Sequence, residues 1–430
     1  QSLAHAARHG RAVWVLFLDF DRFKLINDSL GHKCGDFVLT TLAAHMVENC
    51  RGSDTAARLG GDEFVIVLTE PEGAQLSPAI VERLMTSLSQ PIHVYGHELQ
   101  LTASIGIAAY PHDGSTADAL IEHADIAMYQ AKQNGRSNFC FYTPSMNASA
   151  MARLELENRL RTALDNDEFR LHYQPQIDIA TGEVFGAEAL IRWQDAHHGL
   201  VPPDEFIRIA EETGLIVPIG EWVIRTACEQ HRQWLEDGFA PMRVSVNLSP
   251  VQFARKDLVG TVAGVLRETG MNPDYLELEL TESMVMRDVE HAVSQLNELK
   301  SLGVRLCVDD FGTGYSSLAY LKRFPIDVLK IDKSFVRDVA TDGESAAIVT
   351  AIITLARALN MQTVAEGVEL PEQLEQLRED RCDRMQGYLA SRPLPAPQFE
   401  ALLLDWARPA RPPETPAGEE AAQTEVAQAA

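Results

Sequence analysis

Polar side chains end one apolar segment after another in the second half of this 430-residue chain. Glu188 lies within such a segment, and the residues that follow the others are Asn247, Glu279, Asp309, Asp310, Lys330, Asp332, Glu366 and Gln386. Several carboxylates with one amide oxygen and no sulfur form the donor set that Mg²⁺ or Mn²⁺ prefers. Adjacent Asp309 and Asp310 suit a pair of ions about 3.5–4 Å apart, which clamps both oxygens of an in-line phosphoryl displacement. Lys330, among these acids, could orient or activate the attacking water.

Each acid taken singly is more simply a solvated strand end. Their placement on successive segments changes this interpretation, because acidic side chains crowded at one mouth repel each other unless a cation offsets them. We therefore expect a two-metal site for phosphoryl chemistry.

The elements that must position these residues are short apolar strands separated mostly by amphipathic helices. The expected strands are 170–177, 184–193, 243–248, 275–280, 304–308, 328–331, 362–365 and 385–389. The expected helices between them are 220–234, 290–302, 346–359 and 371–377. This alternation predicts a (β/α)8 barrel of the TIM type, in which the carboxyl ends of the strands meet at one mouth. Only residues 178–183 separate the first two strands, too few for a helical crossover, so we expect these strands to pair antiparallel in an irregular barrel.

The first 142 residues contain a second group of polar residues on an α/β pattern. The expected strands are 13–20, 64–68 and 101–109, with a hairpin that turns at Gly96 and a helix over 118–134. The first strand ends at Asp19-Phe-Asp-Arg-Phe-Lys, and Arg58-Leu-Gly-Gly-Asp-Glu-Phe-Val forms a tight turn between apolar stretches. Two glycines there let a phosphate approach the backbone closely.

The amino-acid composition limits the kinds of partner that the chain can bind. There are 37 Lys and Arg residues against 62 Asp and Glu, a net charge of −25, which disfavours binding to nucleic-acid polymers or anionic membranes. The six cysteines are scattered, which is typical of reduced thiols and predicts a cytoplasmic location. No segment is long and apolar enough to span a membrane, and the chain opens at Gln1, so we expect a region of a longer protein whose membrane or sensory segment lies upstream.

The C-terminal motifs resemble those of the EAL family of cyclic di-GMP phosphodiesterases. The matching segments run in order from about Arg153 to Trp406: Glu188-Ala-Leu-Ile-Arg-Trp, Val246-Asn-Leu-Ser, Glu279-Leu-Thr-Glu, Asp309-Asp-Phe-Gly-Thr-Gly-Tyr-Ser-Ser-Leu, Lys330-Ile-Asp, Ala365-Glu-Gly-Val-Glu and Gln386-Gly-Tyr. One departure is Arg208, which stands where the family usually has Pro.

The resemblance implies a role for each residue. The implied metal ligands or near neighbours are Glu188, Asn247, Glu279, Asp309, Asp310 and Glu366. Lys330 and Asp332 would handle the water, Gln386 would lie near the metals, and Arg192 would meet the substrate phosphates. Glu282 would hold the loop that carries Asp310.

The N-terminal motifs resemble the GGDEF family of diguanylate cyclases, over about residues 11–142, and imply a nucleotidyl-cyclase-like fold. The resemblance assigns Asp19, the Phe20 carbonyl and Asp62 to Mg²⁺ held by GTP, and gives Glu63 a role in activating the ribose hydroxyl or as a further ligand. The other implied contacts are Asn27 and Asp36 with guanine, Lys132 and Arg136 with the triphosphate, and Arg51 and Asp54 with an inhibitory product. An ordinary surface ion pair is the alternative for Arg51 and Asp54.

We therefore expect a GGDEF domain over 1–143, a short glycine-free connector over 144–152 that leads into a helix over 151–164, an EAL barrel over 153–408 and a disordered tail over 409–430. The leading hypothesis is hydrolysis of cyclic di-GMP to linear pGpG with Mg²⁺ or Mn²⁺, regulated by GTP in the N-terminal domain. The alternatives are net synthesis of cyclic di-GMP from two GTP in a homodimer, and a receptor that binds nucleotide without turnover.

Overall fold

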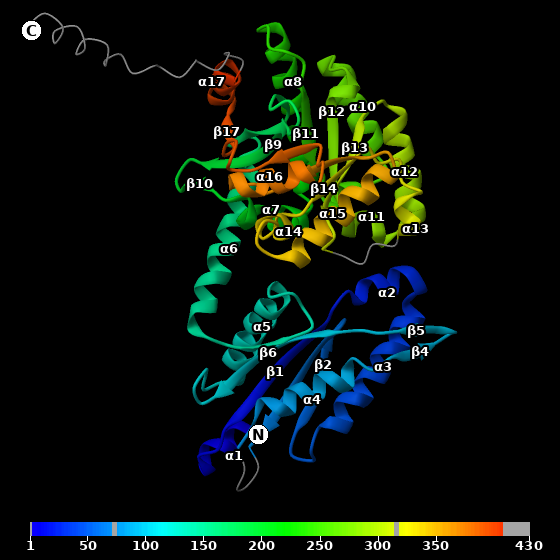
Figure 1. Ribbon diagram of the computed structural model, residues 1–430. Helices are drawn as coiled ribbons and strands as arrows, with labels where there is room; N and C mark the ends of the chain where they lie inside the picture. The colour runs from blue at the N-terminus through cyan, green and yellow to red at the C-terminus, as the bar shows by residue number, and fades with distance from the viewer. Residues whose placement is uncertain (1, 71–74, 314–317, 407–430) are drawn as a thin grey trace, which may run out of the picture. The chain divides into compact units, whose positions relative to one another are not determined.

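The computed structural model describes residues 2–70, 75–313 and 318–406 and divides the chain into two compact units, Gln1–Leu156 and Glu157–Ala430 (Figure 1). The predicted tail over 409–430 lies outside the described residues. None of the helices in the described ranges has the length and apolar character that a membrane span requires.

The N-terminal unit is built on a five-stranded sheet in the order β2-β3-β1-β6-β7. Its strands are β1 (Val13–Phe20), β2 (Thr55–Gly60), β3 (Glu63–Thr69), β6 (Ala103–Tyr110) and β7 (Phe139–Phe141). β1 is antiparallel to both β3 and β6, and β6 is parallel to β7. A separate hairpin pairs β4 (Ile92–Val94) with β5 (His97–Leu99), as predicted from Gly96.

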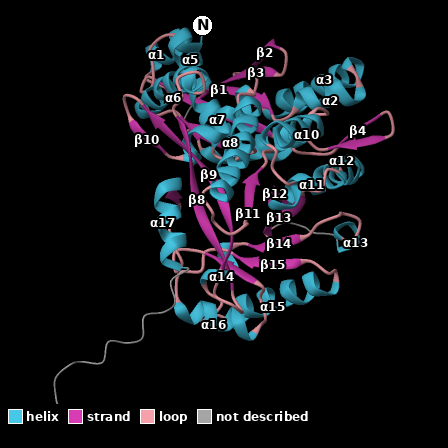
Figure 2. Cartoon of the chain, turned by 90° about the horizontal axis from the view of Figure 1, so that it is seen from above, coloured by secondary structure: helices cyan, strands magenta, loops and turns pink. Residues whose placement is uncertain are grey.

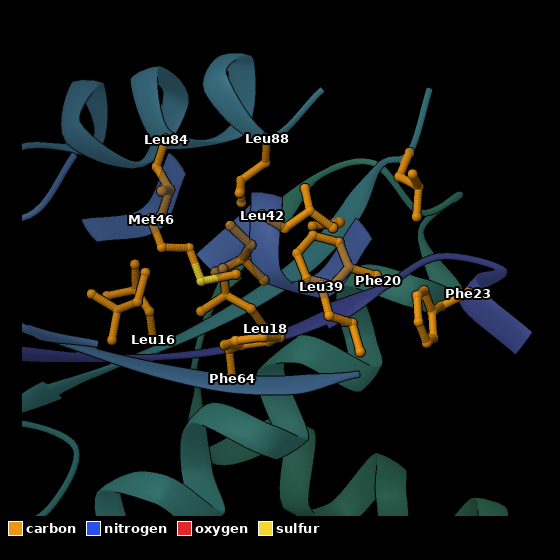
Figure 3. Close-up of a cluster of buried hydrophobic side chains, with 14 of the residues drawn as sticks. Leu16, Leu18, Phe20, Phe23, Leu39, Leu42, Met46, Phe64, Leu84 and Leu88 are labelled. Atoms are coloured by element: carbon orange, nitrogen blue, oxygen red, sulfur yellow. The ribbon is translucent and has the colours of Figure 1, made fainter. Parts of the chain in front are cut away.

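Helices cover both faces of this sheet. They are α1 (Ser2–His9), α2 (Phe23–Leu30), α3 (His32–Asn49), α4 (Pro78–Leu88) and α5 (Ala117–Gln133). Alternate residues of β1 point to opposite faces, so Leu16, Leu18 and Phe20 pack with side chains of α3 and α4 in the cluster of Figure 3. Val15 and Phe17 pack with α5 on the other face. Gly106 lets α5 approach β6, because a Cβ there would lie 1.9 Å from the Ala124 carbonyl oxygen.

The C-terminal unit is a closed barrel with an antiparallel first strand, as predicted. Its strands are β8 (Phe169–Asp178), β9 (Val184–Asp195), β11 (Arg243–Asn247), β12 (Leu276–Thr281), β13 (Arg305–Phe311), β14 (Val328–Ile331), β15 (Gln362–Ala365) and β16 (Arg384–Gln386). β8 pairs antiparallel with both β9 and β16 and so closes the ring, whereas β9 and β11 through β16 run parallel. Two short strands extend the sheet, β10 (Gly199–Val201) and β17 (Leu394–Pro395).

Helices surround these strands, as Figure 2 shows for the barrel unit. They are α7 (Pro203–Thr213), α8 (Ile216–Glu236), α9 (Pro250–Phe253), α10 (Leu258–Thr269), α11 (Glu282–Arg287), α12 (Val289–Ser301), α13 (Leu318–Leu321), α14 (Lys333–Arg337), α15 (Gly343–Ala358), α16 (Pro371–Glu379), α17 (Ala396–Trp406) and the 3₁₀ turn η1 (Pro273–Tyr275). The long predicted helices are all confirmed, with ends that differ by a few residues.

Two local predictions were wrong. The helix expected from residue 151 begins at Pro144, since α6 spans Pro144–Ala163, and residues 144–152 are therefore helical. Proline is well tolerated in a first helical turn, and no glycine follows it to interrupt the helix. The strand expected over 385–389 ends at Gln386. There Gly387 packs against the Val368 backbone, where a Cβ would lie 2.1 Å from the carbonyl oxygen.

Candidate functional site

The predicted carboxylates of the barrel converge on the Lys330 ammonium. Lys330 comes from β14 and is fully buried, and its Nζ lies 2.6 Å from a Glu366 oxygen and 2.8 Å from a Glu279 oxygen. Glu188 and Asp309 oxygens lie 3.2 and 3.7 Å from the same atom. These side chains come from four strands and from the residue that follows β15, so only the closed barrel brings them together.

Burial and the charges of neighbouring side chains shift the pKa values of these residues. Burial and the Glu188 charge raise the pKa of Glu279 well above its usual range, and burial raises that of Glu366 to about 7. Although burial opposes the charged form of Glu188, the Lys330 charge and hydrogen bonds from Gln386 and Asn247 hold its pKa below the usual value. Burial also opposes the charge on Lys330, but the surrounding carboxylates raise its pKa well above the ordinary value. A lysine held protonated can donate hydrogen bonds to a water or a substrate but cannot accept a proton.

These residues fit divalent cations. One ammonium faces four carboxylates, which leaves a deficit of positive charge. The Glu279 Oε1 atom is buried without a hydrogen-bond partner among the described residues. Oxygen atoms of Asp309, Asp310 and Glu366 lie within 4.8 Å of one another, a spacing that one ion could bridge. The donor set consists of oxygens, as Mg²⁺ and Mn²⁺ prefer.

Asp310 is presented on a strained bend. Its φ of 53° is left-handed, and the register of β13 against β14 shifts between Val308 and Phe311. The Gly312 amide, at the start of the loop that follows Asp310, donates to Glu282 at 3.0 Å. Residues 314–317 of that loop lie outside the described part of the chain. Burial and the neighbouring charges of Asp309 and Asp332 raise the pKa of Asp310 to about 6.

Asp332 caps α14 and also interacts with Asp310. Its Oδ1 accepts the Ser334 amide at 3.0 Å and caps α14. Burial opposes its charge, but hydrogen bonds from Ser334 and Asp310 keep the pKa of Asp332 below the usual range. Of these two neighbouring carboxyls, Asp310 therefore has the higher pKa and Asp332 the lower.

An apolar cavity of about 290 Å³ adjoins these acids. Its lining includes Arg192 and Asn247 together with Leu190, Ile207 and Pro250. Arg192 is half-buried, and burial lowers its pKa. The cavity offers the Arg192 cation, the Glu211 carboxyl and apolar walls to a ligand next to Asn247. Arg208 lies elsewhere, on the exposed side of α7, where its Nε is 3.2 Å from Glu212.

The sequence interpretation missed four buried polar residues of the barrel interior. They are Gln174, Gln176, Ser245 and Glu277. Gln174 and Gln176 are separated by one residue on β8, and such spacing on a strand puts both side chains on one face. That alternation was the available signal, but the strand is apolar enough to be interpreted as ordinary core.

The N-terminal group gathers where β1 and the β2–β3 turn meet. Asp19 pairs in register with Glu63, and an Asp19 oxygen lies 2.7 Å from the Lys132 ammonium of α5. Burial, aided by the charges of Asp62 and Asp21, raises the pKa of Asp19 against the opposing effect of Lys132. Gly61 has a φ of 53°, and the Arg58 guanidinium donates to its carbonyl at 2.7 and 2.9 Å. Phe20 packs its ring into the core, which leaves its carbonyl at the strand end.

The expected base contacts lie on neighbouring helices. Asn27 of α2 is half-buried and packs on Gly35 of α3, where a Cβ would lie 2.0 Å from the Asn27 Oδ1. Asp36 follows and is exposed. Arg136 is also exposed, just after α5.

Arg51 and Asp54 lie at the opposite end of the β2–β3 pair from the Gly61 turn. Asp54 accepts the backbone amides of Arg51 at 2.8 Å and Thr69 at 3.1 Å, so it shapes the turn into β2. The alternative of an Arg51–Asp54 side-chain ion pair is not seen in the described residues. A further carboxylate that we missed is Asp21, which is buried and accepts from Thr102 and Ser104 at 2.6 and 2.8 Å.

The chain combines an α/β unit with a barrel that carries oxygen donors at its mouth. Comparison with models of known families identifies the family to which it belongs. The family model described as EAL domain matches residues 157–393, and that described as diguanylate cyclase, GGDEF domain, matches residues 1–138. The chain therefore belongs to the EAL domain family and carries a GGDEF domain ahead of it.

Named relatives have the same arrangement. The bifunctional diguanylate cyclase/cyclic di-GMP phosphodiesterase MucR of Pseudomonas aeruginosa is 47% identical over 93% of this chain and 58% of its own length. The cyclic di-GMP phosphodiesterase PdeR of Escherichia coli is 41% identical over 92% of this chain and 60% of its own. The chain thus spans a little over half the length of these relatives. A solved PaMucR phosphodiesterase in complex with c-di-GMP is 48% identical, covers 57% of this chain and 99% of its own, and has a TM-score of 0.56.

Proposed function

We propose that the barrel hydrolyses one phosphodiester bond of cyclic di-GMP to give linear pGpG, with Mg²⁺ or Mn²⁺. The observation that carries this proposal is the set of four carboxylates around Lys330 at the barrel mouth, because their charge calls for cations at the place where a barrel binds its substrate. The names of the relatives and the c-di-GMP complex of PaMucR support the choice of substrate.

The residues that would hold the metals range from buried to exposed, and they are Glu188, Glu279, Asp309, Asp310, Glu366 and the exposed Asn247. Bound metals supply Lewis acidity and lower the pKa of a water. Lys330 remains protonated and donates hydrogen bonds at the centre of the site. Asp332, whose pKa lies below the usual range, would accept a hydrogen bond from a water held next to it. Gln386 donates to Glu188 at 2.6 Å and orients that carboxylate.

The cavity beside the acids suits a nucleotide. Its apolar lining from Leu190, Ile207 and Pro250 fits the face of a purine, while Arg192 meets a phosphate. Arg192 is half-buried, so its charge acts through a medium that screens it less than water does.

The test is to incubate the full chain with cyclic di-GMP and Mg²⁺ or Mn²⁺ and to separate the products by chromatography. Wild type should release pGpG and should stop in excess EDTA. Glu188→Ala should lower turnover at least a hundredfold, because it removes a metal ligand, whereas the exposed Glu236→Ala on α8 should not. Release of pGpG by the Glu188 variant at the wild-type rate, or in EDTA, would contradict the proposal.

A second proposal concerns the N-terminal unit, which we infer binds GTP with Mg²⁺ at Asp19, the Phe20 carbonyl, Asp62 and Glu63. The juxtaposition of Asp19 with Lys132 supports it, since a triphosphate with its metal would satisfy both charges. Asn27 and Asp36 would read guanine, Arg136 would join Lys132 on the phosphates, and Arg51 with Asp54 would bind inhibitory product. Synthesis of cyclic di-GMP would need two such units in a homodimer.

GTP in this unit is proposed to raise the phosphodiesterase rate. The motivation is α6, which continues through the predicted connector without a glycine. The test is to titrate a non-hydrolysable GTP analogue while pGpG release is followed in wild type and Asp62→Ala. A several-fold rise confined to wild type is expected, and a flat response there would reject the regulation.

A further inference from the structure

A buried hydrogen-bonded chain runs through the barrel interior to the carboxylate of Glu188. Strand register assembles it: Gln386 of β16 pairs with Gln176 of β8, and Ser245 of β11 pairs with Glu188 of β9 on one side and with Glu277 of β12 on the other. All five side chains are at most 5% exposed. Water therefore has little access to them, and the hydrogen bonds that they make are with protein groups.

The amide of Gln386 is fully used. Its nitrogen donates one hydrogen to Glu188 Oε2 at 2.6 Å and the other to Gln174 Oε1 at 3.1 Å. Its oxygen accepts from Gln176 Nε2 at 3.2 Å. The donor from Gln176 thus supports, together with the acceptors Glu188 and Gln174, the orientation in which the Gln386 nitrogen faces Glu188.

Gln176 is oriented in turn from the other side. Its nitrogen donates to Gln386 and, at 3.4 Å, to the Ser245 hydroxyl. Ser245 donates its own hydrogen to Glu277 Oε1 at 3.1 Å, because a carboxylate offers only acceptors. The Ser245 oxygen is then left as an acceptor for Gln176. Gly186 makes room for Gln176, since a Cβ at Gly186 would lie 3.3 Å from the Gln176 Oε1.

We propose that Gln176, held by Ser245 and Glu277, is a positioning residue that keeps the nitrogen of Gln386 on Glu188 and so orients Glu188 for metal binding. This inference rests on the proposed metal site. Without the Gln176 donor, the buried Gln386 oxygen loses its hydrogen bond and the amide is held only through its nitrogen, so its orientation towards Glu188 is less firmly fixed. Partners that orient a metal ligand typically change metal affinity by about 10–100-fold when they are removed.

The first experiment measures binding of Mn²⁺ alone to the full chain by electron paramagnetic resonance. Gln176→Leu should weaken Mn²⁺ binding by about tenfold or more. The matched control is Gln295→Leu on α12, which also removes a buried amide, one that donates to the Arg255 carbonyl at 3.0 Å. The control should leave Mn²⁺ binding unchanged. With saturating Mn²⁺, the turnover of cyclic di-GMP by Gln176→Leu should recover most of the wild-type value.

The second experiment tests whether Gln176 acts through Gln386. Gln386→Leu should weaken Mn²⁺ binding, and the double variant Gln176→Leu/Gln386→Leu should bind no more weakly than Gln386→Leu alone. Independent contributions would instead multiply. If Gln176→Leu fails to fold, Ser245→Ala, which removes one buried hydroxyl, should still weaken Mn²⁺ binding several-fold.

Three outcomes would overturn the inference about Gln176. Equal Mn²⁺ affinities for Gln176→Leu, Ser245→Ala and the Gln295→Leu control would overturn the inference while the proposed hydrolysis stands. Full multiplication of the two effects in the double variant would also overturn it. Wild type that neither binds Mn²⁺ nor hydrolyses cyclic di-GMP would overturn both the proposed function and this inference.

Discussion

The two candidate sites of the molecule place a lysine among carboxylates in different ways. Lys330 of the barrel has a side chain that is 1% exposed and meets acids from three other strands and from the residue after β15. Lys132 of the N-terminal unit has a side chain that is 25% exposed, and its Nζ lies 2.7 Å from an Asp19 oxygen. The barrel encloses four carboxylates with a single ammonium. In the N-terminal unit the side chains of Lys132 and Asp19 are partly open to solvent.

This difference indicates which of the two sites has its side chains in place before a ligand binds. Strands β9, β11, β12, β14 and β16 direct side chains into one interior, where hydrogen bonds fix them. Glu63 and Arg136 of the N-terminal group are exposed, and Asp62 is half-buried. We therefore expect the barrel site to depend on metal for stability and the N-terminal site to take its final geometry from the bound nucleotide.

The largest expected effect comes from removing the buried cation. Lys330→Met leaves four carboxylates without their ammonium and should lower the free energy of unfolding by about 3–5 kcal/mol in the absence of metal. Added Mg²⁺ should restore part of the loss. Lys132→Met, its counterpart in the N-terminal unit, should cost no more than about 1 kcal/mol. Urea unfolding of both variants with and without Mg²⁺ measures this, and equal losses would show that burial does not separate the two sites.

The next largest effect is expected on nucleotide binding by the N-terminal unit. It shows whether side chains determine the preference of this site for GTP. Asp62→Ala should weaken GTP binding by about tenfold or more, because it removes a metal ligand. Asn27→Ala should instead reduce the preference for GTP over ATP by about tenfold, since one guanine contact is lost. Calorimetry in Mg²⁺ measures both.

Asp118→Ala, at an exposed position in the first turn of α5, is the control for these two variants. GTP affinity that is the same in Asp62→Ala and in this control would place the pocket elsewhere.

The smallest effect concerns acid stability of the barrel unit. Burial opposes the charge of Asp195, but the amides of His197 and His198, the His198 ring and Arg159 hold its pKa well below the usual range. Its folded pKa is therefore lower than its unfolded one, near 3.9, so its stabilisation is present above about pH 4 and is lost as the pH falls further. Asp195→Asn should cost about 1–2 kcal/mol at pH 7 and less at pH 3.

The fluorescence of Trp193, which lies 5.5 Å from the Arg159 guanidinium, can follow this unfolding at each pH. A loss in Asp195→Asn that stays constant from pH 7 to pH 3 would contradict the assignment. Asp178→Asn, at an exposed turn of the same unit, supplies the control for a changed charge.

The sequence by itself determined the order of elements and the chemistry of the barrel mouth. Alternating apolar and amphipathic segments were enough to predict the barrel and its antiparallel first strand, because period and loop length depend on neighbours in the chain. Oxygen-bearing residues at successive strand ends were enough to predict Glu188, Glu279 and Asp309 as one group. The extent of α6 was not predicted, since its first turn begins at a proline within a polar stretch.

Only the tertiary structure decided which of these polar groups hold the others in place. Gln176, Ser245 and Glu277 look like isolated polar residues in apolar strands, and their partners are up to 210 residues away along the chain. Strand register sets these contacts, and it depends on the closure of the whole barrel. The charge states of Lys330 and Glu366 were likewise hidden, because a pKa follows from burial and nearby charge, and both arise only when distant strands meet.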